Sequence, residues 1–216
     1  DDTTEGTVGP SSVTFTSANW NTPQTVTVTG VDDSLDDGDI VYHVITAAAT
    51  SADSHYSSLD PSDVAVTNTD NDTSGFTVSA ISGNTTEAGG TATFTIALTA
   101  QPTADVVVGL SSDNTSEGTV SPSSVTLTSA NWNTPQTVTV TGVDDSVDDG
   151  DIVFHVVTAA ATSADPNYSG LNPSDIALTN TDNDSSGFTV SAISGNTTEA
   201  GNTATFTIAL TAHPTA

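Results

Sequence analysis

The stretch Thr91-Ala-Thr-Phe-Thr-Ile-Ala-Leu-Thr99 alternates polar and apolar side chains along almost its whole length. Successive side chains of a β-strand point to opposite faces, so this alternation predicts a strand with one buried face and one solvated face. The buried face would carry Ala92, Phe94, Ile96 and Leu98. Threonine fills the other face, and this mixture of threonine with apolar residues is typical of sheets rather than of disordered linkers.

Six further segments of the central part of the chain show shorter versions of this pattern. Turns rich in Gly, Pro, Asn, Asp and Ser separate them, and no stretch has a convincing helical period. About seven short strands in 112 residues predict an all-β fold, an immunoglobulin-like antiparallel β-sandwich. One run, 152–157, is apolar almost throughout, so we expect it to be more deeply buried. The predicted strands are Gly75–Ser79, Thr91–Thr99, Asp105–Leu110, Val125–Leu127, Thr137–Val143, Ile152–Val157 and Asp175–Thr179.

The chain repeats itself at an offset of 112 residues without a gap. Of the 104 positions that can be compared, 88 are identical, so that Trp20 recurs as Trp132. A period of this length suits an independently folding domain in a tandem array. We place the domain boundaries after the two Asp-Asn-Asp runs. The prediction is the back part of one repeat at 1–72, a complete repeat at 73–184 and the front part of the next repeat at 185–216.

The composition excludes several classes of protein. The chain has no Lys or Arg and 27 Asp and Glu, which gives a formal charge of −27. Nothing in it can neutralise phosphates, so we expect no nucleic-acid partner. Its apolar runs are too short for membrane insertion. It has no Cys, which excludes disulfides and thiolate metal sites.

The acidic residues gather in two runs of each repeat, and each run follows a predicted strand. One run is Val143-Asp-Asp-Ser-Val-Asp-Asp-Gly-Asp151 and the other is Thr181-Asp-Asn-Asp184. Crowded carboxylates repel one another, and this chain has no Lys or Arg to relieve the repulsion. Ca²⁺ prefers six to eight oxygen ligands in flexible geometry, whereas Zn²⁺ would want His or Cys. The runs therefore predict calcium binding; the alternative is a solvated acidic loop that only keeps the protein soluble.

Three segments resemble the Calx-β domain family. They are Glu87-Ala-Gly-Gly90 before the first long strand, the acidic run 144–151, and Asp182-Asn-Asp184 at the end of the repeat. The resemblance covers the complete repeat and the matching parts on either side. It implies a calcium-binding β-sandwich whose ions lie at one tip of the domain, facing the next repeat.

Carried over position by position, the resemblance implies a set of calcium ligands. The family's Ser-Asp-Tyr tripeptide is absent here; Glu117 falls at its Asp position, with Asp113 as the alternative. The backbone carbonyl of Val147 would join the carboxylates. Glu199 matches Glu87, but its partners lie beyond residue 216. The implied ligands are Glu87, Glu117, Asp144, Asp145, Asp149, Asp182 and Asp184 in the complete repeat, and Glu5, Asp32, Asp33, Asp37, Asp70 and Asp72 in the leading part.

Other residues favour plainer roles. His43 and His155 lack nearby metal-ligating partners in the sequence, and we interpret them as strand residues. Trp20 and Trp132 are expected to cap the core, with sugar stacking as the alternative, and the threonine rows are expected to be solvent faces. No Ser lies on a nucleophile elbow and no paired carboxylates line a cleft-building domain, so we expect no enzyme.

Together these features predict a structural role. Near-identical repeats favour a calcium-stiffened spacer or stalk in a long extracellular adhesin or filament, on a cell surface and of bacterial type. Its partners would be neighbouring identical repeats and other copies of the chain in a filament. The alternative is a ligand-binding module of a surface adhesin, with a glycan or ice as the ligand.

Overall fold

The computed structural model describes all residues from Asp1 to Ala216 and contains sixteen strands and no helix. No segment therefore forms a helix that is long and apolar enough to span a bilayer. The chain divides into two compact units, Asp1–Thr73 and Ser74–Ala216. The second unit holds the complete repeat and the hairpin that follows it.

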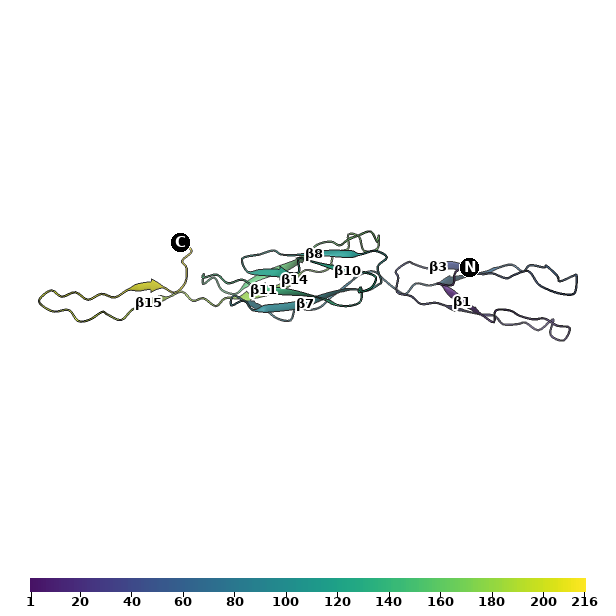
Figure 1. Ribbon diagram of the computed structural model, residues 1–216, viewed down its shortest axis with the longest axis horizontal. Helices are drawn as coiled ribbons and strands as arrows, with labels where there is room; N and C mark the ends of the chain where they lie inside the picture. The colour runs from purple at the N-terminus through teal and green to yellow at the C-terminus, as the bar shows by residue number, and fades with distance from the viewer. The chain divides into compact units, whose positions relative to one another are not determined.

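The complete repeat is a sandwich of two sheets (Figure 1). The first sheet has the strand order β5-β7-β11-β9, and the second has the order β10-β8-β12-β14-β6, with β13 paired to β8. The first sheet consists of β5 (Phe76–Val78), β7 (Thr91–Leu98), β11 (Gln136–Gly142) and β9 (Gly118–Ser121). The second consists of β10 (Ser124–Leu127), β8 (Val106–Ser112), β12 (Ile152–Thr158), β14 (Ile176–Thr181), β6 (Thr85–Thr86) and β13 (Thr162–Ser163).

The strand pairing is immunoglobulin-like, as the sequence predicts. The chain enters the first sheet as β5, crosses to the second as β6 and returns to the first as β7. β6 pairs with the last strand, β14, in parallel, whereas the other strand pairs of the repeat are antiparallel. This arrangement confirms the predicted all-β sandwich.

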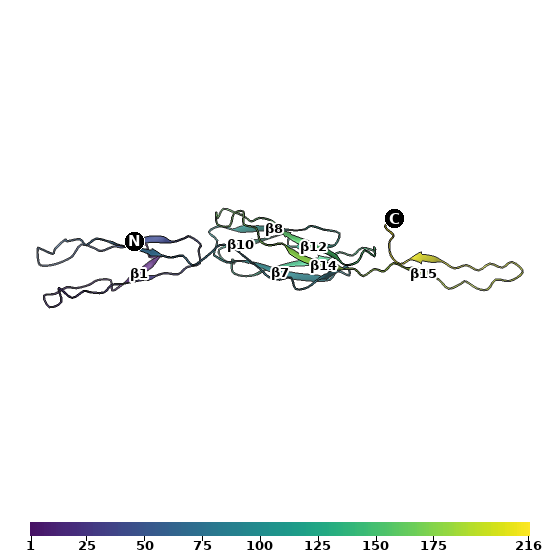
Figure 2. The ribbon, with the colours of Figure 1, turned by 180° about the vertical axis from the view of Figure 1, so that it is seen from behind.

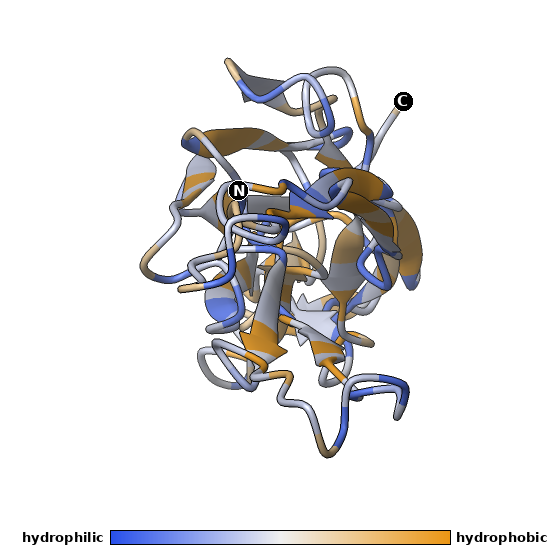
Figure 3. Cartoon of the chain, turned by 90° about the vertical axis from the view of Figure 1, so that its right-hand side faces the viewer, coloured by the Kyte–Doolittle hydropathy of each residue, from blue (hydrophilic) through white to orange (hydrophobic).

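The core lies between the inward faces of the two sheets. Ala92, Phe94, Ile96 and Leu98 are at most 4% exposed, as their alternation with threonine predicts. They meet Val138 and Val140 within their own sheet and residues of β8, β12 and β14 from the other. The alternation is visible in Figure 3 as orange and pale bands along the strands, with blue concentrated in the loops.

Two details differ from the sequence prediction. The repeat has eight strands of three or more residues and two of only two residues, rather than about seven. The strand missed was β9, whose four residues include a single large apolar side chain, Val120. Strand β12 is not buried on both faces, because Val153 is 62% exposed while Phe154 and Val156 are buried. An exposed valine on the outer face of a sheet satisfies strand propensity without contributing to the core.

The two partial repeats form small sheets without a sandwich core. The first unit holds β1 (Gly6–Gly9) paired with β2 (Thr27–Gly30), and β3 (Ile40–Val44) paired with β4 (Val64–Asn68). The last segment is a hairpin of β15 (Phe188–Val190) and β16 (Ile208–Leu210), shown in yellow in Figure 2. Their apolar side chains are largely exposed.

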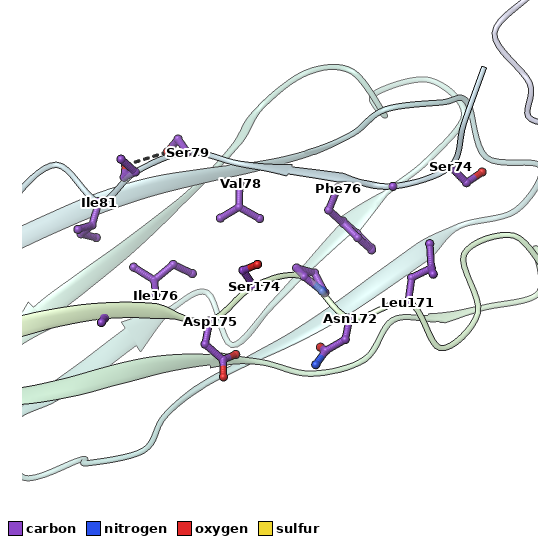
Figure 4. Close-up of a pocket in the computed structure, with 14 residues that line it drawn as sticks. Ser74, Phe76, Val78, Ser79, Ile81, Leu171, Asn172, Ser174, Asp175 and Ile176 are labelled. Atoms are coloured by element: carbon purple, nitrogen blue, oxygen red, sulfur yellow. Dashed lines mark hydrogen bonds between the residues drawn. The ribbon is translucent and has the colours of Figure 1, made fainter. Parts of the chain in front are cut away.

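A groove of 690 Å³ opens along one side of the sandwich, between β5 and the segment leading into β14. Phe76 and Val78 point from β5 toward Leu171 and Ile176 of the other layer (Figure 4). The groove follows from the topology, because β6 covers the edge of β14 only at Asn180 and Thr181.

Candidate metal centre

The strand register brings the acidic segments to one end of the complete repeat. Gly118 at the start of β9 pairs with Gly142 at the end of β11. In the other sheet, Ile152 at the start of β12 pairs with Asn180, and Thr86 at the end of β6 pairs with Thr181. The residues that precede or follow these strand ends therefore meet, although they are up to 97 positions apart in the sequence.

The first cluster consists of Glu87, Asp182 and Asp184, each with a carboxylate oxygen within 4.8 Å of the others. Glu87 is only 2% exposed and accepts a hydrogen bond from the backbone N–H of Asn183 at 3.0 Å. Asp182 accepts from the backbone N–H of Asp184 at 2.7 Å and from that of Gly150 at 2.7 Å. Gly150 has a φ of 79°, a conformation that glycine adopts without strain.

The charges of this cluster disfavour one another. Burial, followed by the nearby charges of Asp182 and Asp145, raises the pKa of Glu87. Desolvation and the charge of Asp182 likewise raise the pKa of Asp184. By contrast, the hydrogen bonds from the N–H groups of Asp184 and Gly150 lower the pKa of Asp182. The loops thus hold one carboxylate that hydrogen bonds stabilise beside two, Glu87 and Asp184, whose ionised forms burial and neighbouring charges disfavour.

The second cluster consists of Glu117, Asp145 and Asp149, again within 4.8 Å of one another. Glu117 is 5% exposed and accepts from the side-chain amide of Asn180 at 3.4 Å. The same amide donates to the carbonyl of Val143 at 3.0 Å. Asp145 accepts from the N–H of Val147 at 2.7 Å, which folds the acidic loop back on itself.

The remaining residues of the acidic loop lie around these two clusters. Asp144 is exposed and accepts from the side chain of Asn183 at 3.1 Å, but it belongs to neither cluster. The carbonyl of Val147 accepts from the N–H of Asp149 at 3.0 Å. Asp148, which is not among the ligands that the resemblance implies, accepts from the N–H of Ser186 at 2.7 Å. The loop is also joined to the following hairpin by the N–H of His213, which donates to the carbonyl of Ser146 at 2.6 Å.

The structure places Glu117, and not Asp113, beside the acidic loop. Asp113 accepts from the backbone N–H of His155 at 2.7 Å, and its other oxygen lies 2.8 Å from the Nδ1 of that histidine. These hydrogen bonds lower the pKa of Asp113. The same pair occurs in the leading repeat, where Asp1 accepts from the backbone N–H of His43 and its other oxygen lies 3.2 Å from the Nδ1 of that histidine.

The leading partial repeat holds a third cluster, of Glu5, Asp33 and Asp37. Glu5 is 8% exposed and accepts from the side-chain amide of Asn68 at 3.2 Å, as Glu117 does from Asn180. Desolvation, with the charges of Asp33 and Glu5, raises the pKa of Asp37. This cluster lines a cavity of 190 Å³, together with Asp32, Asp70 and Asp72.

The leading unit lacks one of the two clusters of the complete repeat. Asp70 and Asp72 correspond to Asp182 and Asp184, and Asp70 again accepts from the N–H groups of Gly38 and Asp72 at 2.8 Å. The residue matching Glu87 would precede residue 1, so this pair has no glutamate beside it within the unit. Glu199, which does match Glu87, is exposed and belongs to no cluster.

The donor set of all three clusters is made of oxygen. The ion pairs of the chain join His43, His55 and His155 to nearby aspartates, and none involves a cluster residue. Carboxylates with backbone carbonyls nearby suit a hard cation such as Ca²⁺. Two unit charges 4 Å apart repel by about 4 kcal/mol at an effective dielectric constant of 20, so a cation placed between them removes a substantial penalty.

The tryptophans differ between the two repeats. Trp132 is half-buried and packs against the core, as expected for a capping residue. Trp20, at the same position of the leading repeat, is 69% exposed because the layer it would cover is absent from that unit.

Comparison with known proteins gives no family assignment. No protein-family model matches the chain. No curated protein matches it either. Among solved structures it is similar to WR4, a member of the MSP family of Caenorhabditis elegans, with 12% identity, a TM-score of 0.30, and coverage of 46% of this chain and 90% of that one.

Two other solved structures show similar levels of likeness. SSP-19, an MSP-domain-like protein of Caenorhabditis elegans, has 13% identity, a TM-score of 0.31, and coverage of 48% of this chain and 98% of that one. Domains 1–6 of the surface layer protein SbsC have 13% identity and a TM-score of 0.33, with 87% of this chain covered. This chain spans 32% of the length of that structure.

Proposed function

We propose that this chain is part of a calcium-stiffened spacer, built from tandem Calx-β-like repeats, in a long extracellular surface adhesin or filament. The observation that carries the proposal is the position of Asp182 and Asp184. These residues belong to a carboxylate cluster and also lie at the junction between one repeat and the next. A cation held there would fix the end of one sandwich and the chain leaving it.

The hydrogen bonds at this junction support the proposal. The acidic loop already contacts the following hairpin, through Asp148 to the N–H of Ser186 and through the carbonyl of Ser146 to the N–H of His213. Without a counter-ion, the mutual repulsion of the loop carboxylates works against these contacts. Calcium would remove that repulsion and so hold the loop against its neighbour.

The near-identity of the repeats also favours a spacer. Of 104 comparable positions, 88 are the same, and the differences fall mostly on conservative apolar exchanges and on turn residues. A spacer needs only the same fold and the same junction in each copy. The role places the chain outside the cell, where calcium is abundant, with neighbouring repeats as its partners and no catalytic step.

The direct test is thermal unfolding of the 216-residue chain at low protein concentration, in calcium, in magnesium and in chelator. Ligand that binds only the folded state stabilises it by about 2.7 kcal/mol at a concentration one hundred times Kd. We therefore expect the midpoint to rise by about 10 °C or more with calcium and much less with magnesium. An unchanged midpoint in calcium would reject calcium binding.

A matched pair of variants locates the effect. Glu87→Gln removes one charge from the first cluster, whereas Glu199→Gln removes one charge from the same position of the next repeat, where Asp182 and Asp184 have no counterparts within the chain. We expect the calcium-induced rise to shrink in Glu87→Gln and to stay complete in Glu199→Gln. Equal behaviour of the two variants would show that calcium acts on general charge and not at this cluster.

A further inference from the structure

We propose that the groove along the side of the complete repeat binds an extended, basic segment of another protein, which adds to the free edge of β14 as a further strand. The groove has a volume of 690 Å³ and lies between β5 and the segment leading into β14. All the residues that line it belong to 74–81 and 171–177. It is therefore a feature of the complete repeat itself.

One wall of the groove offers backbone groups of β14 that no strand covers. The carbonyl of Thr179 points toward β6, where it accepts from the hydroxyl of Thr85 at 3.3 Å. Since peptide groups alternate in direction along a strand, the N–H and carbonyl of Ala177 point to the same edge. β6 pairs with β14 only at Asn180 and Thr181. The backbone of Ala177 therefore faces the groove without a strand beside it.

The neighbouring strand β12 does not use these groups of Ala177. His155 lies opposite Ala177 in the register of β12 and β14. However, the N–H of His155 donates to the carboxylate of Asp113 at 2.7 Å, and its carbonyl accepts from the N–H of Asp113 at 3.0 Å. The backbone of His155 thus faces away from β14, and the two residues form a non-hydrogen-bonded pair. The N–H and carbonyl of Ala177 remain available to an incoming strand.

The other wall is β5, which is itself the edge of the first sheet. The carbonyl of Gly75 and the N–H of Ser79 make backbone hydrogen bonds of 3.0 Å to β7 and to the residue that follows it. By the same alternation, the peptide groups of Phe76 and Val78 face the open side of β5. The groove thus has a free strand edge on each side, and free edges of this kind are sites of strand addition.

The floor between the two edges is apolar. Phe76, Val78 and Ile81 of one wall and Leu171 of the other are only partly buried, and they pack against the core. Figure 4 shows Phe76 and Val78 pointing across the groove toward Leu171 and Ile176. A bound strand turns every second side chain toward such a floor, so the groove suits a segment with apolar residues at alternate positions.

Charge favours a basic partner over a second copy of this chain. Asp175 is the only charged residue that lines the groove, and its carboxylate accepts from the N–H and the hydroxyl of Thr158 at 2.8 and 3.1 Å. The chain as a whole has a formal charge of −27 and no Lys or Arg. Two copies would therefore repel each other, whereas a segment flanked by Lys or Arg would be attracted. The sequence 1–216 cannot supply such a segment, so the partner is another protein.

Both walls of the groove recur in the partial repeats. Residues 187–193 repeat 75–81 without change, and residues 59–65 repeat 171–177 with two substitutions. In a tandem array, each complete repeat would therefore present the same groove. A partner with several basic strand segments would then bind the array more tightly than it binds a single repeat.

The test measures the binding of a fluorescent peptide to the 216-residue chain in chelator, so that calcium plays no part. The probe has Val alternating with Thr between two pairs of lysines. We expect saturable binding that weakens as the salt concentration rises. Two control peptides should bind about tenfold more weakly or worse: one has glutamates in place of the lysines, and the other has N-methyl groups on its backbone amides. Equal binding of the acidic peptide would reject a basic partner, and equal binding of the methylated one would reject strand addition.

A variant of β14 locates the bound peptide. Ala177→Pro removes the N–H that faces the groove, at an edge position where proline is tolerated, and its ring obstructs the incoming strand. We expect binding to weaken by about tenfold or more. Ala177→Thr keeps the N–H and should bind like the unmodified chain. Ala65→Pro is the matched substitution in the leading unit, which has no counterpart of β5. Unchanged binding in Ala177→Pro, or an equal loss in Ala65→Pro, would overturn the proposal.

Hydrogen exchange of the unmodified chain tests the site without any substitution. The peptide should slow amide exchange in 74–81 and 171–178 and leave the acidic loop 144–151 unchanged. This result would support the proposal even if Ala177→Pro failed to fold. Protection confined to other segments, or no protection at saturating peptide, would overturn it.

Discussion

The same eight residues occur twice in this chain and end up in two different states. Within 91–98 they form an eight-residue strand in which Phe94 is 1% exposed. Within 203–210 only the last three residues form a strand, and Phe206 is 55% exposed. The local sequence is identical, so the difference comes from what lies opposite. The comparison shows that alternation specifies which face is apolar, whereas the neighbouring strand and the second layer determine whether that face is buried.

The largest expected effect comes from truncating the two phenylalanines. Phe94→Ala removes a fully buried ring from the middle of the core and should lower the free energy of unfolding of the complete repeat by about 3–5 kcal/mol. Phe206→Ala removes the same atoms from an exposed strand and should leave that free energy unchanged. Denaturant unfolding of both variants at low concentration measures the difference. Comparable losses would mean that the hairpin is packed in solution, against the arrangement described above.

A smaller effect is expected from a buried tyrosine. The hydroxyl of Tyr168 donates to the carbonyl of Ala100 at 2.6 Å and accepts from the N–H of Ala100 at 3.1 Å, with both residues fully buried. Tyr168→Phe leaves two buried backbone groups without this partner and should cost about 2 kcal/mol. Tyr56 is the counterpart in the leading repeat and is 62% exposed. Tyr56→Phe should therefore be neutral in the same unfolding measurement, and a loss there would show that the leading unit is packed.

These contrasts show which features of the fold can be predicted from the sequence of this protein and which cannot. Alternation correctly predicted which face of β7 points inward. A period of two puts its large apolar side chains on one face of the strand, and that face is the buried one. Alternation did not identify β9, because only one of its four residues is large and apolar. It also did not predict the exposure of Val153, because that residue lies in a continuous apolar run. The pairing of β9 and the exposure of Val153 are both decided by contacts between strands, which form only when the chain folds.

The candidate metal centre, too, could be predicted from the sequence only in part. The sequence indicates which loops are acidic, and every residue of the three clusters was among the ligands implied by the family resemblance. It does not indicate which carboxylates meet. That depends on the parallel pairing of β6 with β14, which brings Glu87 to Asp182 across 95 residues. It depends also on Asn180, whose amide bridges Glu117 and the carbonyl of Val143. Whether these clusters bind calcium stays a prediction.

The smallest effect concerns an aspartate that stabilises a loop, and it depends on pH. Asp165 is 3% exposed and accepts from the backbone N–H groups of Thr103 and Asn167 at 2.8 and 2.9 Å. Burial alone would raise the pKa of Asp165, but these hydrogen bonds outweigh it and hold the pKa below its usual value of 3.8. A carboxylate whose pKa is lower in the folded state stabilises that state above its unfolded pKa, and loses the contribution as the pH falls through the folded value.

Asp165→Asn should accordingly lower the free energy of unfolding by about 1.5 kcal/mol between pH 7 and pH 5, and the difference from the unmodified chain should shrink below about pH 4. The matched control is Asp53→Asn, since Asp53 is exposed and no residue of the leading unit corresponds to Thr103. That variant should differ little from the unmodified chain at any pH. A loss for Asp165→Asn that stayed constant down to pH 3 would assign the effect to packing instead of to the ionised carboxylate. The aspartate matters only where the loop between β7 and β8, which carries Thr103, is in place. This is the same dependence on a neighbouring segment that separates Phe94 from Phe206.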